Sequence, residues 1–439
     1  MRPWWRLFPF PNRDELQRAQ RERLAALIDR VRASNPFYQR KLAGVAFDAR
    51  RDPLEQLPLT TRDELQADQA ANPPFGTNLS FPLDQYNRFH QTSGSTGEAP
   101  LRWLDTPESW SWWKRCWSAV FAAADVDPGD RVMFPFSFGP FVGFWSAFDA
   151  AVDLGCLCFP GGGLNTAARV RQILEHGATV VCCTPTYALH MAQTAEASGL
   201  SLADSDVRRV IVAGEPGGNI PATRTAIETS WGARACDHAG MTEIGAWGFE
   251  DAAAPGALIV NEAEFMAEVI DPETGVPRAE GEEGELVLTN LGRLGSPLIR
   301  YRTGDVVRLT RDHDGPPLAR AVGGVRGRVD DLLFIRGNNV FPSAIEGILR
   351  DVTGVAEFRI CVEQRGALRD LTLEIEATPS VEQVRLAEVI ADAVRERLCF
   401  RPTVRVVPPG TLPRFELKAR RVVVRPAGEG NHPPQRSES

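Results

Sequence analysis

Apolar residues near the start of the chain recur at helical spacing. Leu16, Leu24, Leu27, Ile28 and Val31 fall on one face of the segment from residue 13 to residue 43. The pattern predicts an N-terminal helical lead that ends before Pro36, because proline breaks a helix. The rest of the fold is expected to begin after this lead.

A further helix is predicted immediately after Thr106. A threonine can cap a helix, Pro107 suits the first helical position, and Glu108 favours the positive end of the helix dipole. The aromatic residues that follow recur every three or four positions and therefore share one face. They are Trp110, Trp113, Trp117 and Phe121. We expect this face to pack in the core.

Buried strands and amphipathic helices alternate between residues 131 and 215. Apolar runs at 179–183 and 210–213 predict strands, and amphipathic patterns at 167–176 and 188–197 predict helices. Such alternation is typical of a mostly parallel α/β sheet between helical layers. The uncharged run 132–148 is interrupted by prolines and glycines, so it predicts a buried strand, a loop and a helix start instead of a membrane span.

Hairpin-like patterns replace this alternation from residue 264 onward. Segments 265–270 and 285–289 predict strands on either side of a turn at 271–275. Alternating apolar residues then predict two strands near 358–362 and 371–375. This second pattern is typical of a separate small α+β unit.

A helix is expected after these strands. Ser380 and Gln383 have the spacing of a capping box, and the predicted helix continues to about Leu398. The predicted fold class is α/β, with a large layered N-terminal domain at 1–329 and a small α+β C-terminal domain at 330–425. The polar tail at 426–439 is expected to be disordered.

Composition narrows the possible partners and compartments. The 439-residue chain is 43% hydrophobic and carries 57 acidic against 49 basic residues, which opposes binding to nucleic acid. Pro9 and Pro11 interrupt the N-terminus before a signal-peptide core develops, so a cytoplasmic location and no membrane partner are expected. The eight cysteines show neither metal-ligand nor disulfide spacing and are expected to be buried free thiols.

One glycine-rich loop carries residues suited to binding phosphate. Its glycines let backbone N–H groups turn inward, and its hydroxyl side chains can donate to phosphate oxygens. The loop consists of Thr92, Ser93, Gly94, Ser95, Thr96 and Gly97. On its own such a run is more typical of a surface turn. It also lacks the Gly-Lys-Ser/Thr ending of a P-loop nucleotide hydrolase.

Further short stretches change that interpretation. Gly240-Met241-Thr242-Glu243, then Tyr301-Arg302-Thr303-Gly304-Asp305, then Gly327-Arg328-Val329-Asp330-Asp331, and finally Lys418 follow the loop in this order. Together they resemble the adenylate-forming superfamily of acyl-CoA synthetases, and within it the phenylacetate-CoA ligase-like branch. The resemblance covers about residues 13–425.

The resemblance implies an AMP-forming acid–thiol ligase. Such an enzyme uses ATP and Mg²⁺ to convert a carboxylic acid into an acyl-AMP with release of pyrophosphate, and then passes the acyl group to CoA. A carrier protein, an amine or another small nucleophile is an alternative acceptor. A degenerate member that binds nucleotide or an aryl ligand without turnover is a second alternative. Dimerisation, common in this branch, makes a homodimer an expectation by analogy.

The resemblance also implies roles for individual residues. Lys418, Arg328 and Thr242 would be catalytic, Glu243 would bind the metal, and Asp330 would be the hinge of a mobile C-terminal domain. Nucleotide contacts are expected from the loop 92–97 and from Gly214, Glu215, Pro216, Asp237, His238, Ala239, Gly240, Met241, Asp305 and Arg328. An ionised Asp305 suits ribose because its two oxygens can accept from both hydroxyls.

Four positions depart from the family pattern. Near Lys418, Phe415 and Leu417 replace the small residues that are usual there. Glu98 stands where the loop usually carries a lysine, and a carboxylate about 4 Å from a phosphate charge would cost about 4 kcal/mol at an effective dielectric of 20. Arg102 is the nearest residue that could pair with it. Ala239 stands where a tyrosine usually stacks on adenine, a loss of about 1–3 kcal/mol that His238 or Trp247 would have to offset.

An aromatic-rich segment is the expected acyl pocket. It contains Phe136, Phe138, Gly139, Phe141, Phe144 and Trp145, and Ala213 and Gly214 are expected on the opposite side. Such a wall suits a flat aryl acid, although ordinary core packing would use the same residues. Some relatives carry a Cys/His zinc site after the Met-Thr-Glu motif. Residues 250–264 contain neither cysteine nor histidine, so no zinc is expected.

Overall fold

The computed structural model describes residues 4–92, 99–311, 317–335, 338–365, 368–379, 381–416 and 418–425. The expected phosphate-loop residues Ser93, Gly94, Ser95, Thr96 and Gly97 lie outside this part of the chain, as do Glu98, Ser380 and the tail from residue 426. The side chain of Phe144 lies outside it as well.

The described helices cover the predicted helical segments. They are α1 (Arg13–Ser34), α2 (Pro36–Lys41), α3 (Arg62–Ala71), α4 (Pro107–Ala123), α5 (Val142–Leu154), α6 (Thr166–Glu175), α7 (Pro185–Ala197), α8 (Pro221–Trp231), α9 (Pro342–Asp351) and α10 (Gln383–Leu398). The predicted end of the helical lead before Pro36 is confirmed, because α1 stops at Ser34 and the Asn35 side chain caps the separate helix α2.

A 12-stranded sheet forms the large unit. Its strands are β3 (Arg131–Phe134), β4 (Leu157–Pro160), β5 (Val180–Cys183), β6 (Arg209–Ala213), β7 (Arg234–Met241), β8 (Gly245–Phe249), β9 (Ala257–Val260), β10 (Phe265–Ile270), β11 (Glu283–Asn290), β12 (Tyr301–Arg311), β13 (Ala319–Val322) and β14 (Gly327–Arg328). Strands β4, β3, β5, β6 and β7 are parallel neighbours, as the alternating pattern predicts. From β7 to β10 the pairing is antiparallel, and the predicted β10–β11 hairpin is confirmed.

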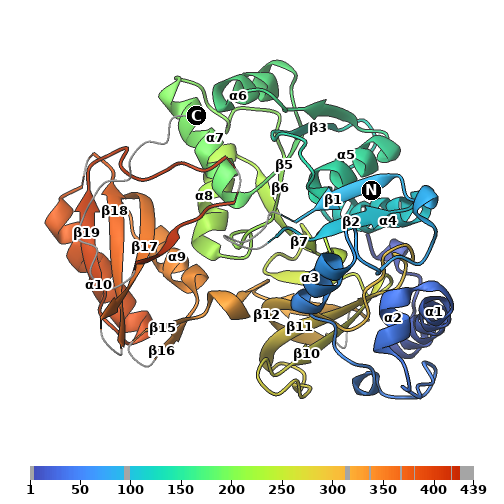
Figure 1. Ribbon diagram of the computed structural model, residues 1–439. Coiled ribbons are helices and arrows are strands. Elements are labelled where there is room, and N and C mark those ends of the chain that lie inside the picture. Colours follow the sequence, from blue (N-terminus) through green and yellow to red (C-terminus); the bar gives the residue numbers. More distant parts are fainter. Residues whose placement is uncertain are drawn as a thin grey trace.

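Helices cover both faces of the parallel strands. Val181 and Cys183 of β5 pack with apolar residues of α6, α7 and α8, whereas Val180 and Cys182 pack on the side of α4 and α5. Successive residues of a strand point to opposite faces, so each parallel strand contributes to two cores. Strands β3, β5 and β6 are therefore covered on both sides, whereas β4 lies at the edge of the sheet and Leu157 is exposed (Figure 1).

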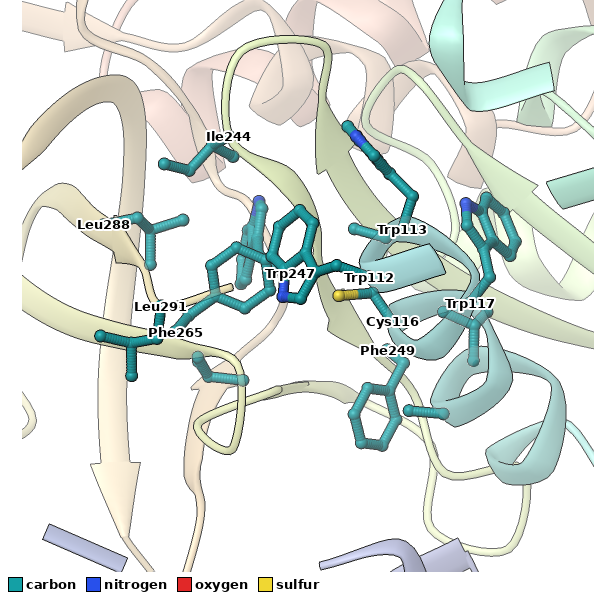
Figure 2. Packing of buried hydrophobic residues seen from close by; sticks show 14 of the residues in the cluster. Trp112, Trp113, Cys116, Trp117, Ile244, Trp247, Phe249, Phe265, Leu288 and Leu291 are labelled. Atoms are coloured by element: carbon teal, nitrogen blue, oxygen red, sulfur yellow. The ribbon is translucent and has the colours of Figure 1, made fainter. Parts of the chain in front are cut away.

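Helix α4 carries the predicted aromatic face. The Thr106 side chain accepts from the Ser109 backbone N–H, and Pro107 opens the helix, so the predicted start is confirmed. Trp110, Trp113, Trp117 and Phe121 are all buried. Figure 2 shows Trp112 of this helix beside Trp247 and Phe265, which belong to the antiparallel part of the sheet, and the ring centroids of Trp112 and Phe265 lie 5.3 Å apart. This packing ties the two halves of the large unit together.

A smaller unit follows the large sheet. It contains α9, α10 and a four-stranded sheet of β17 (Val355–Arg365), β18 (Leu368–Ala377), β19 (Thr403–Val407) and β20 (Val422–Arg425) in the order β19-β18-β17-β20. Two short strands, β15 (Leu333–Ile335) and β16 (Asn338–Val340), precede α9. Figure 1 shows this unit, in orange and red, beside α7 and α8 of the large unit.

Two predictions are wrong in detail. Helix α10 begins at Gln383 with Glu382 in the capping position and no side-chain cap, so Gln383 cannot close the predicted capping box three residues into the helix. Cys156 and Cys158 are only partly buried and Cys399 is exposed, although all eight cysteines are free thiols. Within the described ranges, no helix combines the length and apolar composition needed to cross a membrane.

Candidate active site at the carboxyl ends of the parallel strands

The carboxyl ends of the parallel strands bring several of the predicted residues to one edge. Phe136 follows β3, Gly214 and Glu215 follow β6, and Thr242 and Glu243 follow β7. Because parallel strands all end at the same edge, segments separated by more than 100 residues meet there. Ligands of open α/β sheets characteristically bind at this edge.

The predicted phosphate loop begins from a short hairpin. Strands β1 (Arg88–Gln91) and β2 (Arg102–Asp105) pair antiparallel on either side of it. At the base of the loop, the Thr92 backbone N–H donates to the Leu101 carbonyl over 3.0 Å, and the Thr92 hydroxyl accepts from the Leu101 N–H over 3.0 Å. These two hydrogen bonds hold Thr92 and Leu101 together at the base of the loop. Arg102 donates to the Pro74 carbonyl over 2.8 Å.

Thr242 and Glu243 occupy the tight turn between β7 and β8. Arg293 holds this turn from beneath, because its Nη1 donates to the carbonyls of Thr242 and Glu243 over 2.6 and 2.9 Å. The Glu243 carboxylate is largely buried and receives Arg62 Nη1 of α3 at 3.2 Å. A buried carboxylate is therefore fixed at the edge of the sheet, next to a cation.

Asp305 lies opposite Arg328 in the pairing of β12 with β14. Arg328 Nη1 donates to Asp305 Oδ1 over 3.1 Å and to the Thr303 carbonyl over 3.2 Å. Gly304 adopts a φ of 74°, and a Cβ there would come within 2.7 Å of the Arg328 guanidinium. Burial raises the pKa of Asp305 to about 6, against the opposing effect of Arg328 and Lys418. Its charge is consequently sensitive to pH.

Lys418 reaches this edge from the smaller unit. A Cβ added to Gly214, whose φ is 94°, would lie 3.3 Å from Lys418 Cε, so the lysine passes directly over the end of β6. The positive charge of Lys418 also lowers the pKa of Asp305, which places the two groups in the same electrostatic environment. The structure thus brings together Gly214, Asp305 and Lys418, three predicted site residues from distant parts of the chain.

The β7 residues before the turn have different surroundings. The Asp237 carboxyl is buried and accepts from the Asn219 amide, and burial raises its pKa to about 7. His238 Nδ1 lies 2.7 Å from the Gly248 carbonyl, and its ring lies 4.4 Å from that of Trp117. Burial lowers the pKa of His238 to about 4. His238 is therefore a neutral histidine packed against α4.

The remaining β7 residues lead into the turn. Ala239, Gly240 and Met241 are the last residues of the strand, and Pro216 follows Glu215 in the loop after the neighbouring strand β6. Trp247, considered above as a substitute for the missing adenine stack, is completely buried in the core (Figure 2). Its indole is not available to a nucleotide in this arrangement.

The predicted acyl wall forms a cluster of rings. The Phe138 ring lies 5.4 Å from Phe136, 4.9 Å from Trp145 and 5.3 Å from Phe148. Trp145 is 38% exposed, and its Nε1 donates to the Gly139 carbonyl over 2.8 Å. Phe141 occupies the capping position of α5. The cluster is thus a folded unit that begins inside the core at Phe136 and reaches the surface at Trp145.

Sequence reasoning missed several basic residues of the site. Arg62 meets Glu243 across 181 positions, and Arg293 meets Asp105 across 188. Arg169 meets Glu416 across 247 positions, from the large unit to the small one. No role was predicted for any of the three, and each partner lies more than 180 positions away, so only the fold reveals the pairing. Phe148 could have been predicted as part of the ring cluster, because it follows Phe144 and Trp145 at helical spacing.

Known proteins share this architecture. A family model described as AMP-binding enzyme matches residues 61–292, and the AMP-binding enzyme C-terminal domain matches residues 337–425. Phenylacetate-coenzyme A ligase of Thermus thermophilus is 30% identical, with 94% of this chain and 97% of that protein covered.

Solved structures of one ligase allow a finer comparison. 2-Hydroxyisobutyryl-CoA ligase in the postadenylation state with R3-HIB-AMP gives a TM-score of 0.87 at 26% identity, covering 94% of this chain and 89% of that chain. The same ligase in the thioesterification state with 2-HIB-AMP and CoA gives 0.70 at 27% identity, covering 94% and 90%. Given these matches and the residues assembled at the sheet edge, the chain belongs to the AMP-binding enzyme family, in its phenylacetate-CoA ligase-like branch of adenylate-forming acid–CoA ligases.

Proposed function

We propose that this adenylate-forming ligase activates an aromatic carboxylic acid. The observation that carries the proposal is the ring cluster of Phe136, Phe138, Trp145 and Phe148 at the carboxyl end of β3. Aromatic rings prefer edge-to-face or offset contact with other rings, so such a cluster favours a flat substrate over a long flexible chain. The name of the Thermus thermophilus relative is in keeping with this substrate class.

The first step is the attack of the acid on ATP. A carboxylate oxygen forms a bond to the α-phosphorus while the bond from that phosphorus to the pyrophosphate oxygen breaks. Negative charge accumulates around the α-phosphate, and the Lys418 ammonium beside Gly214 is the mobile cation suited to stabilise it. We assign Asp305 to the ribose hydroxyls, Thr242 to a phosphate oxygen and Arg328 to the nucleotide.

The donor set at the edge of the sheet also fits Mg²⁺. This ion commonly uses one or two protein carboxylates together with substrate phosphates, and Glu243 offers one such carboxylate. No cluster of three or more His, Cys, Asp or Glu side chains suited to a metal occurs in the described ranges. Mg²⁺ would neutralise phosphate charge, and Arg62 would have to yield its contact with Glu243.

The second step transfers the acyl group to CoA. The CoA thiolate attacks the acyl carbon, and AMP leaves with the bonding electrons of the carbon–oxygen bond. We propose that residues 330–425 turn about Asp330 between the steps, which lets one cleft serve two reactions. The higher TM-score against the postadenylation state supports assigning the present arrangement to the first step.

Acid-dependent exchange between ATP and pyrophosphate tests the substrate class. The purified chain is assayed with benzoates, phenylacetates, cinnamates and, as a contrasting class, small hydroxy acids such as 2-hydroxyisobutyrate. We expect exchange with an aryl acid, followed by thioester formation when CoA is added. Exchange with hydroxy acids alone would contradict the aromatic assignment while leaving the adenylating activity intact.

One variant tests the ring cluster itself. Phe138→Ala removes the ring at the centre of the cluster. If this ring contacts the bound aryl acid, losing one such contact costs about 0.5–1.5 kcal/mol, which predicts a KM raised up to about tenfold. Val152→Ala, on the exposed side of the same helix as Trp145, is the matched control and should leave KM unchanged. An unchanged KM in Phe138→Ala would remove the ring cluster from the acyl site.

A further inference from the structure

The segment that carries Lys418 is attached to the large unit on both sides of the lysine. Two residues before it, Glu416 Oε2 accepts from Arg169 Nη1 over 3.3 Å, and Glu416 Oε1 accepts from the Thr166 hydroxyl over 3.4 Å. One residue after it, the Ala419 backbone N–H donates to Glu215 Oε2 over 2.6 Å. Lys418 is therefore held between two contacts that cross from one unit to the other.

Arg169 is fixed without help from the smaller unit. It lies on α6 with only 3% of its surface exposed, and its Nε donates to the Gly161 carbonyl over 3.0 Å. Its Nη1 donates to the Tyr187 hydroxyl over 2.6 Å. A nearby carboxylate stabilises a buried guanidinium. Among the described residues, Glu416 supplies the carboxylate that lies within ion-pair distance of Arg169. The large unit thus presents a rigid cation to which the small unit brings a carboxylate.

The second contact uses the start of a helix. Glu215 Oε1 accepts from the Thr186 backbone N–H over 2.9 Å, in the first turn of α7, while its Oε2 accepts from Ala419. Carboxylates are favoured at helix N-termini, so the side chain of Glu215 is oriented before the small unit arrives. Arg421 adds a further bond, from its Nη1 to the Thr186 hydroxyl over 3.2 Å.

We propose that Glu416 is a positioning residue for Lys418, and that its ion pair with Arg169 is a latch that closes only in the arrangement that forms the adenylate. The proposal rests on the role of Lys418 assigned above. Lys418 itself is exposed, so its position over Gly214 depends on the flanking backbone being held. When the small unit turns for the second step, Glu416 leaves Arg169 and the latch opens.

The proposal predicts different effects on the two half-reactions. A contact made in only one of two arrangements raises the population of that arrangement, and its removal lowers the fraction of enzyme competent for the step performed there. Loss of Glu416 should slow adenylate formation. It should leave thioester formation from a supplied acyl-adenylate unchanged or faster, because the other arrangement becomes easier to reach.

The test compares Glu416→Ala with Glu388→Ala. Glu388 is an exposed carboxylate on α10 of the same unit and serves as the matched control. Glu416 is itself half exposed, and Arg169 keeps its bonds to the Gly161 carbonyl and the Tyr187 hydroxyl, so removal of Glu416 should leave the fold intact. We expect ATP–pyrophosphate exchange to fall about tenfold in Glu416→Ala and thioester formation from synthetic acyl-adenylate and CoA to be retained. Glu388→Ala should match the parent chain in both assays.

The contact between Glu416 and Arg169 can also be tested without substrate. Hydrogen–deuterium exchange of a peptide spanning residues 413–421 should be faster in Glu416→Ala than in the parent chain or in Glu388→Ala, because the Ala419 amide loses protection when the segment detaches. Unchanged exchange in this peptide would overturn the proposal. An equal fall in both half-reactions would also overturn it. If the parent chain activates no acid, the proposed function fails, and deuterium exchange alone decides whether the latch exists.

Discussion

Replacing Arg293 by methionine should uncouple the Thr242–Glu243 turn from the core. Arg293 and Asp105 are both fully buried and form a bidentate pair, with Nε to Oδ1 at 2.7 Å and Nη2 to Oδ2 at 2.6 Å. The guanidinium carbon also lies 5.0 Å from the Trp113 ring. Arg293→Met therefore leaves a buried carboxylate without its counter-charge and two carbonyls of the turn without their donor.

The magnitude follows from these contacts. Removing one partner of a buried ion pair costs about 3–5 kcal/mol, and each buried carbonyl left without a donor adds up to about 1–3 kcal/mol. A typical domain is stable by only about 5–15 kcal/mol. We therefore expect Arg293→Met to lose at least about 4 kcal/mol of unfolding free energy. Arg395→Met, which breaks an exposed pair with Asp392, should cost no more than about 1 kcal/mol.

A double substitution separates stability from function. Arg293→Met with Asp105→Leu replaces the whole pair by apolar side chains, an exchange that is often neutral for stability. The double variant should therefore regain in urea the part of the unfolding free energy that the unpaired Asp105 carboxylate costs, while its turn still lacks the donor to the two carbonyls. Its ATP–pyrophosphate exchange should remain at least tenfold below that of the parent chain.

Two results would refute this reasoning. If Arg293→Met unfolds at the same urea concentration as the parent chain, the buried pair does not stabilise the fold as its geometry implies. If the double variant recovers stability and exchange activity together, Arg293 does not hold the Thr242–Glu243 turn in a functional position. The first result tests the ion pair of Arg293 with Asp105, and the second tests the hydrogen bonds from Arg293 to the carbonyls of Thr242 and Glu243.

Two further predictions concern Asp305 and the glycine at the start of β8. Burial raises the pKa of Asp305 to about 6, so between about pH 4 and 6 the native state keeps a proton that the unfolded chain loses. The contribution of this group to the free energy of unfolding therefore falls as the pH rises through that range. The affinity for adenosine, which carries no phosphate, should fall as the pH drops below about 6 when it is measured by calorimetry. Asp305→Asn should bind adenosine weakly, with an affinity that does not change with pH. The same pH dependence of affinity in both proteins would contradict the ribose assignment. Gly245 has a φ of 130°, and an added Cβ would lie 2.5 Å from the Trp112 ring, so Gly245→Ala should lower the unfolding free energy by about 1–3 kcal/mol. An unaltered urea midpoint would show that Trp112 can move aside.

Local patterns predicted local structure well. The start of α4 is confirmed because Thr106, Pro107 and Glu108 act within one helical turn. The start of α7 lies three residues before the predicted Ala188, at Pro185, where the Thr184 side chain accepts from the Tyr187 N–H. The Thr-Pro pair that carried the α4 prediction is present here too, and the amphipathic pattern alone placed the boundary too late.

The arrangement of the site required the fold. Motif order predicted that Asp305 and Lys418 belong together, but no spacing rule brings a lysine of the small unit over Gly214. The capping box at Gln383 was wrong because the sequence offers the right residue types without fixing where the helix begins. Arg169 and Arg293 were missed because a buried ion pair depends on long-range packing, and their partners lie more than 180 positions away.

The most direct test of the central claim is exchange between ATP and pyrophosphate in Lys418→Ala, using whichever acid the parent chain activates. Arg420→Ala removes an exposed cation two residues away and is the matched control. Loss of a group that stabilises transition-state charge costs about 3–4 kcal/mol, so exchange should fall by about 10²–10³ in Lys418→Ala and persist in Arg420→Ala. Undiminished exchange in Lys418→Ala would contradict the assignment of this lysine to adenylate formation.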